Sequence, residues 1–468
     1  MNQSHKIILF LLSLSMFVVV LDSAIINLAL PAIQKALRFD DSTLQWVVTS
    51  YILTFGGFLM LGGRTADLYG RRRVLMLGLA GFTFCSFLIG FSTSSTMLII
   101  LRALQGLSGA FMAPTALSIL LTSFKEGPER NKALSIWSIV ASGGAAAGVF
   151  LGGVLTQYLG WQWCFFVNVP IGVAAMWGIR KYLPAHILEA RDKHLDLPGA
   201  ILITGGLIAL VYALTVASTA GWTDTTTVMS FVISVMLLAA FLFNETKAKH
   251  PLMPLSIFRL RNLVAGNLIM LPVIAGALGQ FFFLSLYIQN ILHYAPSVSG
   301  VAFLPIPIII GFVSYNTPRL LSKFSAKQLT VVGVGLATLG VFIISFLGEN
   351  SSYWLHMFPA FLLLAVGFGM SFVAITIAAT NGVPHDEAGL ASGILGTAQQ
   401  IGGALGLAVL AVVAHTTTTS DLAAGQNLLS ATMHGYQQAF LTAAALMFIA
   451  WLVAIFILKQ QKTARKVL

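Results

Sequence analysis

The chain has 468 residues, of which 57% are hydrophobic and only 9% are charged, and its formal net charge is +11. Soluble proteins carry about 25% charged residues, so this chain has too few polar side chains to cover a water-facing surface. The composition excludes a soluble enzyme, a disordered protein and a secreted disulfide scaffold, and it indicates an integral membrane protein. The two cysteines lie in apolar runs and predict neither a disulfide framework nor a thiolate metal site.

Apolar stretches separated by short polar breaks predict fourteen spans, each long enough to cross a bilayer core of about 30 Å. The first run is too long for a signal peptide and has no cleavage site after it, so we expect it to be retained. Alternating β patterning is absent, which favours an α-helical bundle over a barrel. The predicted spans are Ile7–Leu30, Leu44–Gly63, Val74–Phe91, Met97–Leu121, Ala133–Leu155, Trp163–Tyr182, Pro198–Ala217, Val228–Phe243, Leu263–Leu292, Gly300–Tyr315, Leu329–Phe346, Trp354–Thr380, Leu390–His415 and Tyr436–Leu458.

Basic residues gather in the loops on one side of these spans. If the N-terminus is cytoplasmic, 23 of the 26 Lys and Arg fall in inner segments, Lys35 and Arg38 fall outside, and Arg102 lies within a span. This positive-inside pattern predicts that both termini are cytoplasmic. It also explains the net charge without a nucleic-acid partner. We expect a multi-pass protein of the inner (cytoplasmic) cell membrane.

Two stretches of the first half have weak counterparts about 255 residues further on. Arg64 aligns with Arg319, and the Gly/Ala-rich run 143–148 aligns with 402–406. Chance similarity between low-complexity helices would also give such echoes, but internal repeats are typical of transporters with a substrate site between two halves. We predict an N-terminal six-helix bundle, a region of cytoplasmic linkers with two extra helices, and a C-terminal six-helix bundle, at residues 1–183, 184–261 and 262–468.

The sequence lacks a Walker loop, a metal-ligand cluster and a nucleophile elbow, so we expect neither an enzyme nor a metal site. It also lacks a voltage-sensor helix and a selectivity-filter motif, which argues against a channel. We expect a transporter driven by an ion or by the gradient of its own substrate.

Asp22 is the only carboxylate well inside a predicted span, and Arg102 is the only base. An Asp at mid-span costs about 2.5–3.5 kcal/mol on insertion scales, so we expect it to have a function. At about 1.5 Å per residue, the two residues lie roughly 12 and 8 Å below the outer surface, within side-chain reach. We interpret them as a proton-coupling pair and expect Asp22→Asn to keep the fold but abolish proton-driven export. A permanent structural ion pair is the alternative.

Five stretches resemble motifs of the major facilitator superfamily. In chain order they resemble the first-span motif of the fourteen-span drug:proton antiporters (EmrB/QacA-type), the signature loop, the proton-transfer motif, the antiporter motif and a sixth-span motif: Leu21–Pro31, Gly63–Arg72, Leu98–Ala110, Gly144–Gly153 and Gly160–Pro170. The resemblance implies that the loop residues Gly63, Arg64, Asp67, Gly70, Arg71 and Arg72 form a conformational switch. It implies that Gly144, Gly148, Gly152 and Gly153 form a hinge.

The resemblance implies an all-α major-facilitator fold with two pseudo-symmetric bundles plus two central helices. It also implies a monomeric, proton-coupled multidrug antiporter that exports lipophilic or amphipathic molecules, monocationic or neutral, by alternating access, with no cofactor beyond the proton. Val149 stands where the antiporter motif has proline, and Leu68 replaces the usual base. The tenth span lacks the acid that the family associates with divalent cations. A dedicated exporter of one endogenous metabolite or antibiotic, and a non-transporting receptor or scaffold, stay as alternatives.

Polar residues at mid-depth predict the walls of a substrate cavity: Asn27, Gln45, Tyr51, Gln280 and Gln289. A second prediction concerns the cytoplasmic gate. The loop before the thirteenth span carries Asp386 and Glu387 and no base, whereas the signature loop is rich in arginine. We predict that Arg71 or Arg72 pairs with one of these acids in the outward-open state. Solvated charges that merely obey the positive-inside rule are the alternative.

Overall fold

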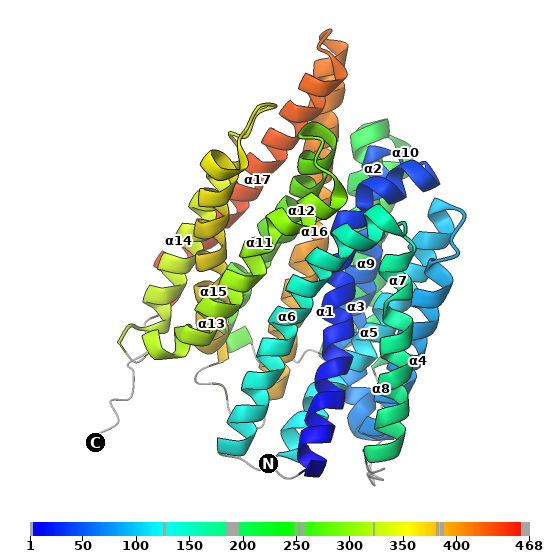
Figure 1. Ribbon diagram of the computed structural model, residues 1–468, viewed down its shortest axis with the longest axis vertical. Coiled ribbons are helices and arrows are strands. Elements are labelled where there is room, and N and C mark those ends of the chain that lie inside the picture. Colours follow the sequence, from blue (N-terminus) through cyan, green and yellow to red (C-terminus); the bar gives the residue numbers. More distant parts are fainter. Residues whose placement is uncertain are drawn as a thin grey trace. The chain divides into compact units, whose positions relative to one another are not determined.

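The protein is described here from a computed structural model, and it is built of helices, with no strand in the described part (Figure 1). Thirteen of the described helices are long and apolar enough to cross a membrane by length and composition, and helix α6 contains the remaining predicted span. The predicted all-α membrane fold is thereby confirmed. The structure describes residues 3–124, 128–183, 196–248, 251–252, 258–321, 323–380, 383 and 388–459.

The chain divides into two compact units, which we describe separately. The first comprises residues 1–252 and 288–304, and the second comprises 253–287 and 305–468. The predicted three-part division stays a prediction; in the observed grouping, the two extra helices belong to the first unit. Its helices are α1 (Gln3–Leu37), α2 (Asp41–Leu44), α3 (Trp46–Tyr69), α4 (Arg71–Ile89), α5 (Ser95–Ser123), α6 (Pro128–Tyr158), α7 (Trp163–Phe166), α8 (Asn168–Tyr182), α9 (Leu197–Ala220), α10 (Thr225–Lys247) and α12 (Pro296–Phe303).

Small residues let the helices of the first unit approach closely. A Cβ atom at Gly62 would overlap the backbone of Ala110, and one at Gly106 would overlap the carbonyl oxygen of Tyr51. These two glycines allow α3 and α5 to pack backbone against backbone. Such small-residue contacts replace the hydrophobic driving force that membrane helices lack between one another.

The extra helices α9 and α10 form a hairpin that is attached to α3. Thr204 of α9 occupies the space beside Gly57, where a Cβ atom would overlap its side chain. The amide of Gln45 donates to the hydroxyl of Thr215 over 3.1 Å in a buried position. At the other end, the Asn244 amide donates to both carboxylate oxygens of Asp196 at 2.8 Å, which joins the two helices of the hairpin.

The second unit contains a helical hairpin that continues past the predicted spans. The span Leu390–His415 lies inside a longer helix that reaches Ala423, and the helix of the span Tyr436–Leu458 begins earlier, at Leu428, and ends at Phe456. Threonines in the added turn donate to carbonyls four residues earlier, so the helix persists where the apolar run ends. The helices of this unit are α11 (Arg261–Leu286), α13 (Pro305–Leu320), α14 (Ala326–Ile344), α15 (Phe358–Thr380), α16 (Ala388–Ala423) and α17 (Leu428–Phe456). The π-helical turn η2 (Tyr287–Ile291) follows α11, and a second turn, η3 (Tyr353–Met357), precedes α15.

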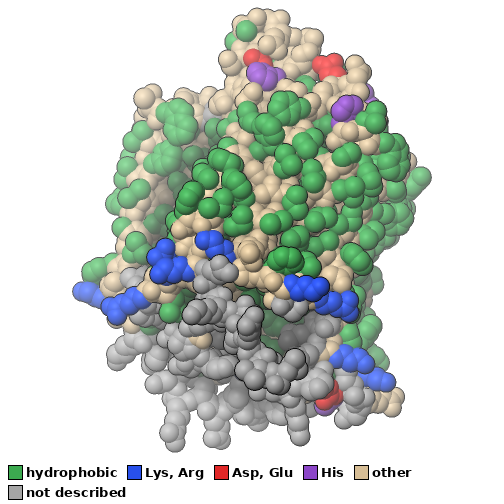
Figure 2. All heavy atoms as spheres, turned by 90° about the vertical axis from the view of Figure 1, so that its left-hand side faces the viewer, with side chains coloured by type: hydrophobic (Ala, Val, Ile, Leu, Met, Phe, Trp, Pro, Cys, Tyr) green, Lys and Arg blue, Asp and Glu red, His purple; other side chains and the backbone are tan. Residues whose placement is uncertain are grey.

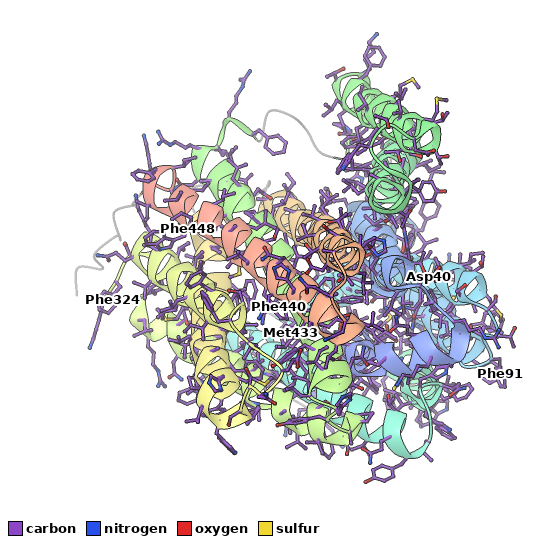
Figure 3. All side chains as sticks on the ribbon, turned by 90° about the horizontal axis from the view of Figure 1, so that it is seen from above. Asp40, Phe91, Phe324, Met433, Phe440 and Phe448 are labelled. Atoms are coloured by element: carbon purple, nitrogen blue, oxygen red, sulfur yellow. The ribbon has the colours of Figure 1, made fainter. Side chains whose placement is uncertain are left out.

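The surface has the pattern expected of a chain in a bilayer. Along α17, Phe440 is fully buried whereas Phe448 is 46% exposed, so one face of the helix packs inward and the other faces outward (Figure 3). Figure 2 shows a broad field of hydrophobic side chains with Lys and Arg gathered along its lower border. This segregation agrees with an apolar belt in hydrocarbon and basic residues at one membrane surface.

Candidate functional site

The first unit holds a fully buried ion pair between α1 and α5. Asp22 and Arg102 are 0% and 1% exposed, and Arg102 Nη1 donates to Asp22 Oδ2 over 2.6 Å. The structure therefore brings together the two residues that the sequence singles out by depth. Since both charges are removed from water, their attraction and hydrogen bonds must offset a desolvation penalty of several kcal/mol per ion.

Two amides complete the environment of the carboxylate. Gln105 Nε2 and Asn168 Nδ2 each donate to Asp22 Oδ1 over 2.9 Å. Gln105 also accepts from Arg102 Nη1 over 2.6 Å and donates to Ser86 Oγ over 2.7 Å. We call Asp22, Ser86, Arg102, Gln105 and Asn168 the Asp22 cluster; all five are buried. Three side-chain donors, one guanidinium and two amides, therefore point at the two oxygens of a single carboxylate.

Arg102 has further partners that are independent of Asp22. Its Nε donates to the carbonyl oxygen of Val47 over 3.0 Å. Its guanidinium carbon lies 4.4 Å from the centre of the Tyr51 ring and 5.8 Å from that of Phe165. The cation is therefore held by a carbonyl and an aromatic face on α3, as well as by the carboxylate on α1.

The predicted hinge glycines hold α6 against α1 beside Asp22. A Cβ atom at Gly148 would lie 2.8 Å from the carbonyl oxygen of Leu21, and one at Gly152 would lie 2.6 Å from that of Ile25. Gly144 faces Phe17 and Val20 on the same helix, whereas Gly153 faces the start of α12. Helix α6 runs without interruption through Val149, the position where the related motif has proline.

The signature loop lies between α3 and α4. Gly70 has φ 98°, a conformation that favours glycine, and this residue lets α4 begin directly after α3 ends. Arg71 Nη1 donates to Thr122 Oγ1 over 3.1 Å, and Arg72 Nη2 donates to the carbonyl oxygen of Arg180 over 2.7 Å. Arg64 is exposed.

Three residues of the predicted switch and gate cannot be placed. The side chain of Asp67 and the gate partners Asp386 and Glu387 lie outside the described residues. Gly63 does lie within them, and a Cβ atom there would be 3.7 Å from Pro114, which is ordinary contact. The tight approach at this level belongs to its neighbour Gly62.

The five residues predicted to line a substrate cavity have separate surroundings. Gln45 is hydrogen-bonded to α9, Tyr51 covers Arg102, and the Asn27 amide donates to the carbonyl of Ser23 on its own helix. Gln289 Nε2 donates to the carbonyl oxygen of Leu28 over 3.3 Å. Gln280 is fully buried in the second unit, and neither of its amide atoms has a hydrogen-bond partner.

Three members of the Asp22 cluster were not predicted as site residues. Gln105 and Asn168 lie in motif stretches, and their amide side chains inside apolar helices were the available signal. Ser86 gives no such signal, because serines are common in membrane helices and only its contact with Gln105 distinguishes it. The described residues contain no group of three or more His, Cys, Asp or Glu that could hold a metal ion. The chemistry that the cluster offers is proton binding at one carboxylate.

Comparisons with known proteins identify the family of the chain. A family model described as "Major Facilitator Superfamily" matches residues 12–407. The puromycin resistance protein pur8 of Streptomyces alboniger is 38% identical over 445 residues, which cover 93% of this chain and 88% of the relative. The cephamycin export protein CmcT of Amycolatopsis lactamdurans is 38% identical over 86% of this chain and 84% of its own. The multidrug resistance protein Stp of Mycobacterium tuberculosis (strain CDC 1551 / Oshkosh) is 32% identical over 88% of this chain and 76% of the relative.

Solved structures share the fold at low sequence identity. The POT family transporter PepTSo superposes with a TM-score of 0.68 and 16% identity, over 96% of this chain and 98% of that one. A bacterial homologue of the human lysosomal transporter Spinster, in an inward-facing and unoccupied conformation, superposes with a TM-score of 0.68 and 16% identity. The superposition covers 99% of this chain and 100% of that one. These likenesses show that the chain shares the fold of these proteins.

Proposed function

Because the chain belongs to the major facilitator superfamily, we propose that it exports small organic molecules, antibiotics among them, in exchange for protons. The proposal rests on the Asp22 cluster, a lone carboxylate–guanidinium pair held fully out of water between two helices. The names of the similar proteins, which refer to antibiotic resistance and export, support the substrate class. The work is transport, with no catalytic step.

The chemistry of the pair supports proton coupling. When Asp22 takes up a proton, its attraction to Arg102 falls from that of an ion pair to that of a hydrogen bond between a cation and a neutral carboxyl group, and the link between α1 and α5 weakens. Ionised and neutral Asp22 then favour different helix arrangements, which is what a coupling group requires. A pair that stays ionised throughout the cycle would only hold the helices together.

The proposed substrates are lipophilic or amphipathic and either neutral or monocationic. Asp22 is the only carboxylate at mid-depth in the described helices of the first unit, and the other buried acids described there, Asp196 and Glu245, lie near the ends of α9 and α10, so no second acid lies beside Asp22 to balance a dication. In the second unit, Gln280 is a candidate contact for a polar group of the substrate. A buried amide without partners costs about 1–3 kcal/mol, and a ligand that bonds to it would recover this cost.

A dedicated exporter of a single compound is the second candidate. Two relatives at 38% identity are named for one antibiotic each, puromycin and cephamycin, and these names favour a narrow range. A multidrug exporter should protect a drug-sensitive host against many unrelated compounds. A dedicated exporter should protect against one compound and its close analogues.

We further propose that the protein is a monomer in the cytoplasmic membrane with both termini inside, as the distribution of basic residues favours. The experiment that tests the function uses the purified chain in liposomes with a pH-sensitive dye inside. Addition of a substrate should dissipate an imposed proton gradient in the wild type and leave it intact in Asp22→Asn. Equal dissipation by both proteins would refute proton coupling through Asp22.

A further inference from the structure

Protonation of Asp22 removes the negative charge that balances the buried charge of Arg102 in the first unit. The guanidinium is 1% exposed and does not lose its charge in a protein. Once Asp22 is neutral, Arg102 becomes a buried cation without a counter-ion, and an uncompensated buried charge is strongly destabilising. Proton uptake is therefore feasible only if other groups stabilise the unpaired guanidinium.

Those groups lie mainly on α3. Val47 supplies a carbonyl oxygen at 3.0 Å, and the face of Tyr51 lies 4.4 Å from the guanidinium carbon. The ring of Phe165 is more distant, at 5.8 Å. A cation over an aromatic face is stabilised more strongly in a desolvated site than in water.

The position of the Tyr51 ring is fixed by its neighbours. Tyr51 is 4% exposed and stacks on Phe55, with ring centres 5.8 Å apart and planes inclined by 22°. On α5, Gly106 leaves room for the Tyr51 backbone, and a Cβ atom at Gly109 would lie 3.3 Å from the Tyr51 hydroxyl. The ring is thus held over Arg102 by packing on both sides, and this packing does not depend on Asp22.

We propose that the Tyr51 ring is the positioning element that stabilises Arg102 when Asp22 is protonated, and that it thereby sets the pH range of export. The proposal rests on the proposed function, because it assumes that Asp22 binds the transported proton. It also gives Tyr51 a different role from the predicted one of lining a substrate cavity.

No other charged group in the described residues competes with this assignment. Among the described residues, the thiol of Cys164 on α7 is the other titratable group that faces the cluster; the thiol of Cys85, next to Ser86 in the sequence of α4, is also buried. The remaining charges of α1, α3, α4, α5, α6 and α8 lie at the helix ends, and α12 carries none.

The test compares pH profiles of substrate-driven proton flux in liposomes. In Tyr51→Met, which removes the ring but keeps much of its volume, the neutral state of Asp22 loses its support. The pH of half-maximal export should then fall by about one unit, a tenfold rise in the proton concentration needed. Tyr51→Phe retains the ring and should have a midpoint close to that of the wild type. Phe82→Leu, which removes another fully buried ring of the first unit, controls for loss of packing.

Each result has a distinct meaning. An unchanged midpoint in Tyr51→Met, or equal shifts in Tyr51→Met and Tyr51→Phe, would overturn the proposal, as would a change confined to the KM for substrate. If Tyr51→Met does not fold, Tyr51→Leu and proton uptake measured by calorimetry on the detergent-solubilised protein provide the same comparison. A wild type without any proton-driven flux would instead refute the proposed function itself.

Discussion

Replacing Asp22 by Asn has a structural cost that the sequence alone does not predict. From the sequence, Asp22→Asn removes an expensive charge from a membrane helix and should leave the fold intact. The structure leads to the opposite expectation, that Asp22→Asn lowers the stability of the protein. Arg102 has no other carboxylate partner among the described residues, so the Asn variant leaves a fully buried guanidinium without a counter-charge.

The size of the effect follows from the contacts. Breaking a buried ion pair by removing one partner costs about 3–5 kcal/mol. The Asn side chain keeps a carbonyl oxygen that Gln105 or Asn168 can bond to, so the cost comes mainly from the unpaired charge. Arg102→Gln should cost less, because Asp22 can bind a proton and become neutral whereas Arg102 cannot lose one. The double variant Asp22→Asn/Arg102→Gln has no buried charge left, and we expect it to be more stable than Asp22→Asn.

Thermal stability of the purified chain in detergent measures this order. The temperature at which half of the protein remains monodisperse should be highest for the wild type and lowest for Asp22→Asn, with the other two variants between them. Because unfolding of membrane proteins is commonly irreversible, the ranking carries the test and not a free energy. All three variants should lack proton-driven export. If Asp22→Asn is as stable as the wild type, or if the two substitutions are additive, the argument for an uncompensated charge is refuted.

Three further predictions concern the cycle. Asn168→Leu removes one donor to the Asp22 carboxylate, a bond worth about 1.5–3 kcal/mol to a charged group, so the pH of half-maximal export should rise; an unchanged profile in liposomes would show that Asn168 is only structural. Arg71→Glu should slow transport, and adding Glu387→Arg should partly restore it, because an ion pair between these positions would stabilise the outward-open state by about 0–1 kcal/mol. The absence of rescue in the double variant would exclude the pairing. A monocationic substrate should be exported faster than its dicationic analogue of similar hydrophobicity, with about one proton per molecule in a flux assay, because Asp22 is the only carboxylate of the Asp22 cluster and the other buried acids described in the first unit, Asp196 and Glu245, lie near helix ends. Faster export of the dicationic analogue would contradict the argument from a single carboxylate.

Depth and spacing made part of the site predictable. Two ionisable residues in a chain with so few charges stand out, and their distance from the outer helix ends indicated that they could meet. The glycines at every fourth position of α6 likewise indicated a close helix neighbour, although the sequence could not tell that the neighbour is α1. These predictions rest on the cost of placing charge in hydrocarbon and on helix periodicity, both of which are local properties.

The partners of polar residues could not be predicted in the same way. As a polar residue at mid-depth, Gln45 is predicted from the sequence to line a cavity, yet its amide donates to Thr215 on an inserted helix far along the chain. Ser86 joins the cluster only through the geometry of Gln105. Hydropathy also marks where a chain leaves the membrane, not where a helix ends, and α16 therefore continues to Ala423.

Because of the length of the α9–α10 hairpin, we expect the protein to be sensitive to the thickness of the surrounding bilayer. At about 1.5 Å per residue, α9 and α10 are roughly 36 and 34 Å long, whereas α14 is roughly 28 Å, close to the hydrocarbon core of a typical membrane. Helix α10 exposes large apolar side chains such as Val235 and Phe243. In a thin membrane the hairpin must tilt or bury its ends, at a cost of fractions of a kcal/mol per Å of mismatch. We expect part of this strain to reach α3 through Gln45, two residues from the Val47 carbonyl that holds Arg102, so that lipids of different chain length would alter the buried ion pair.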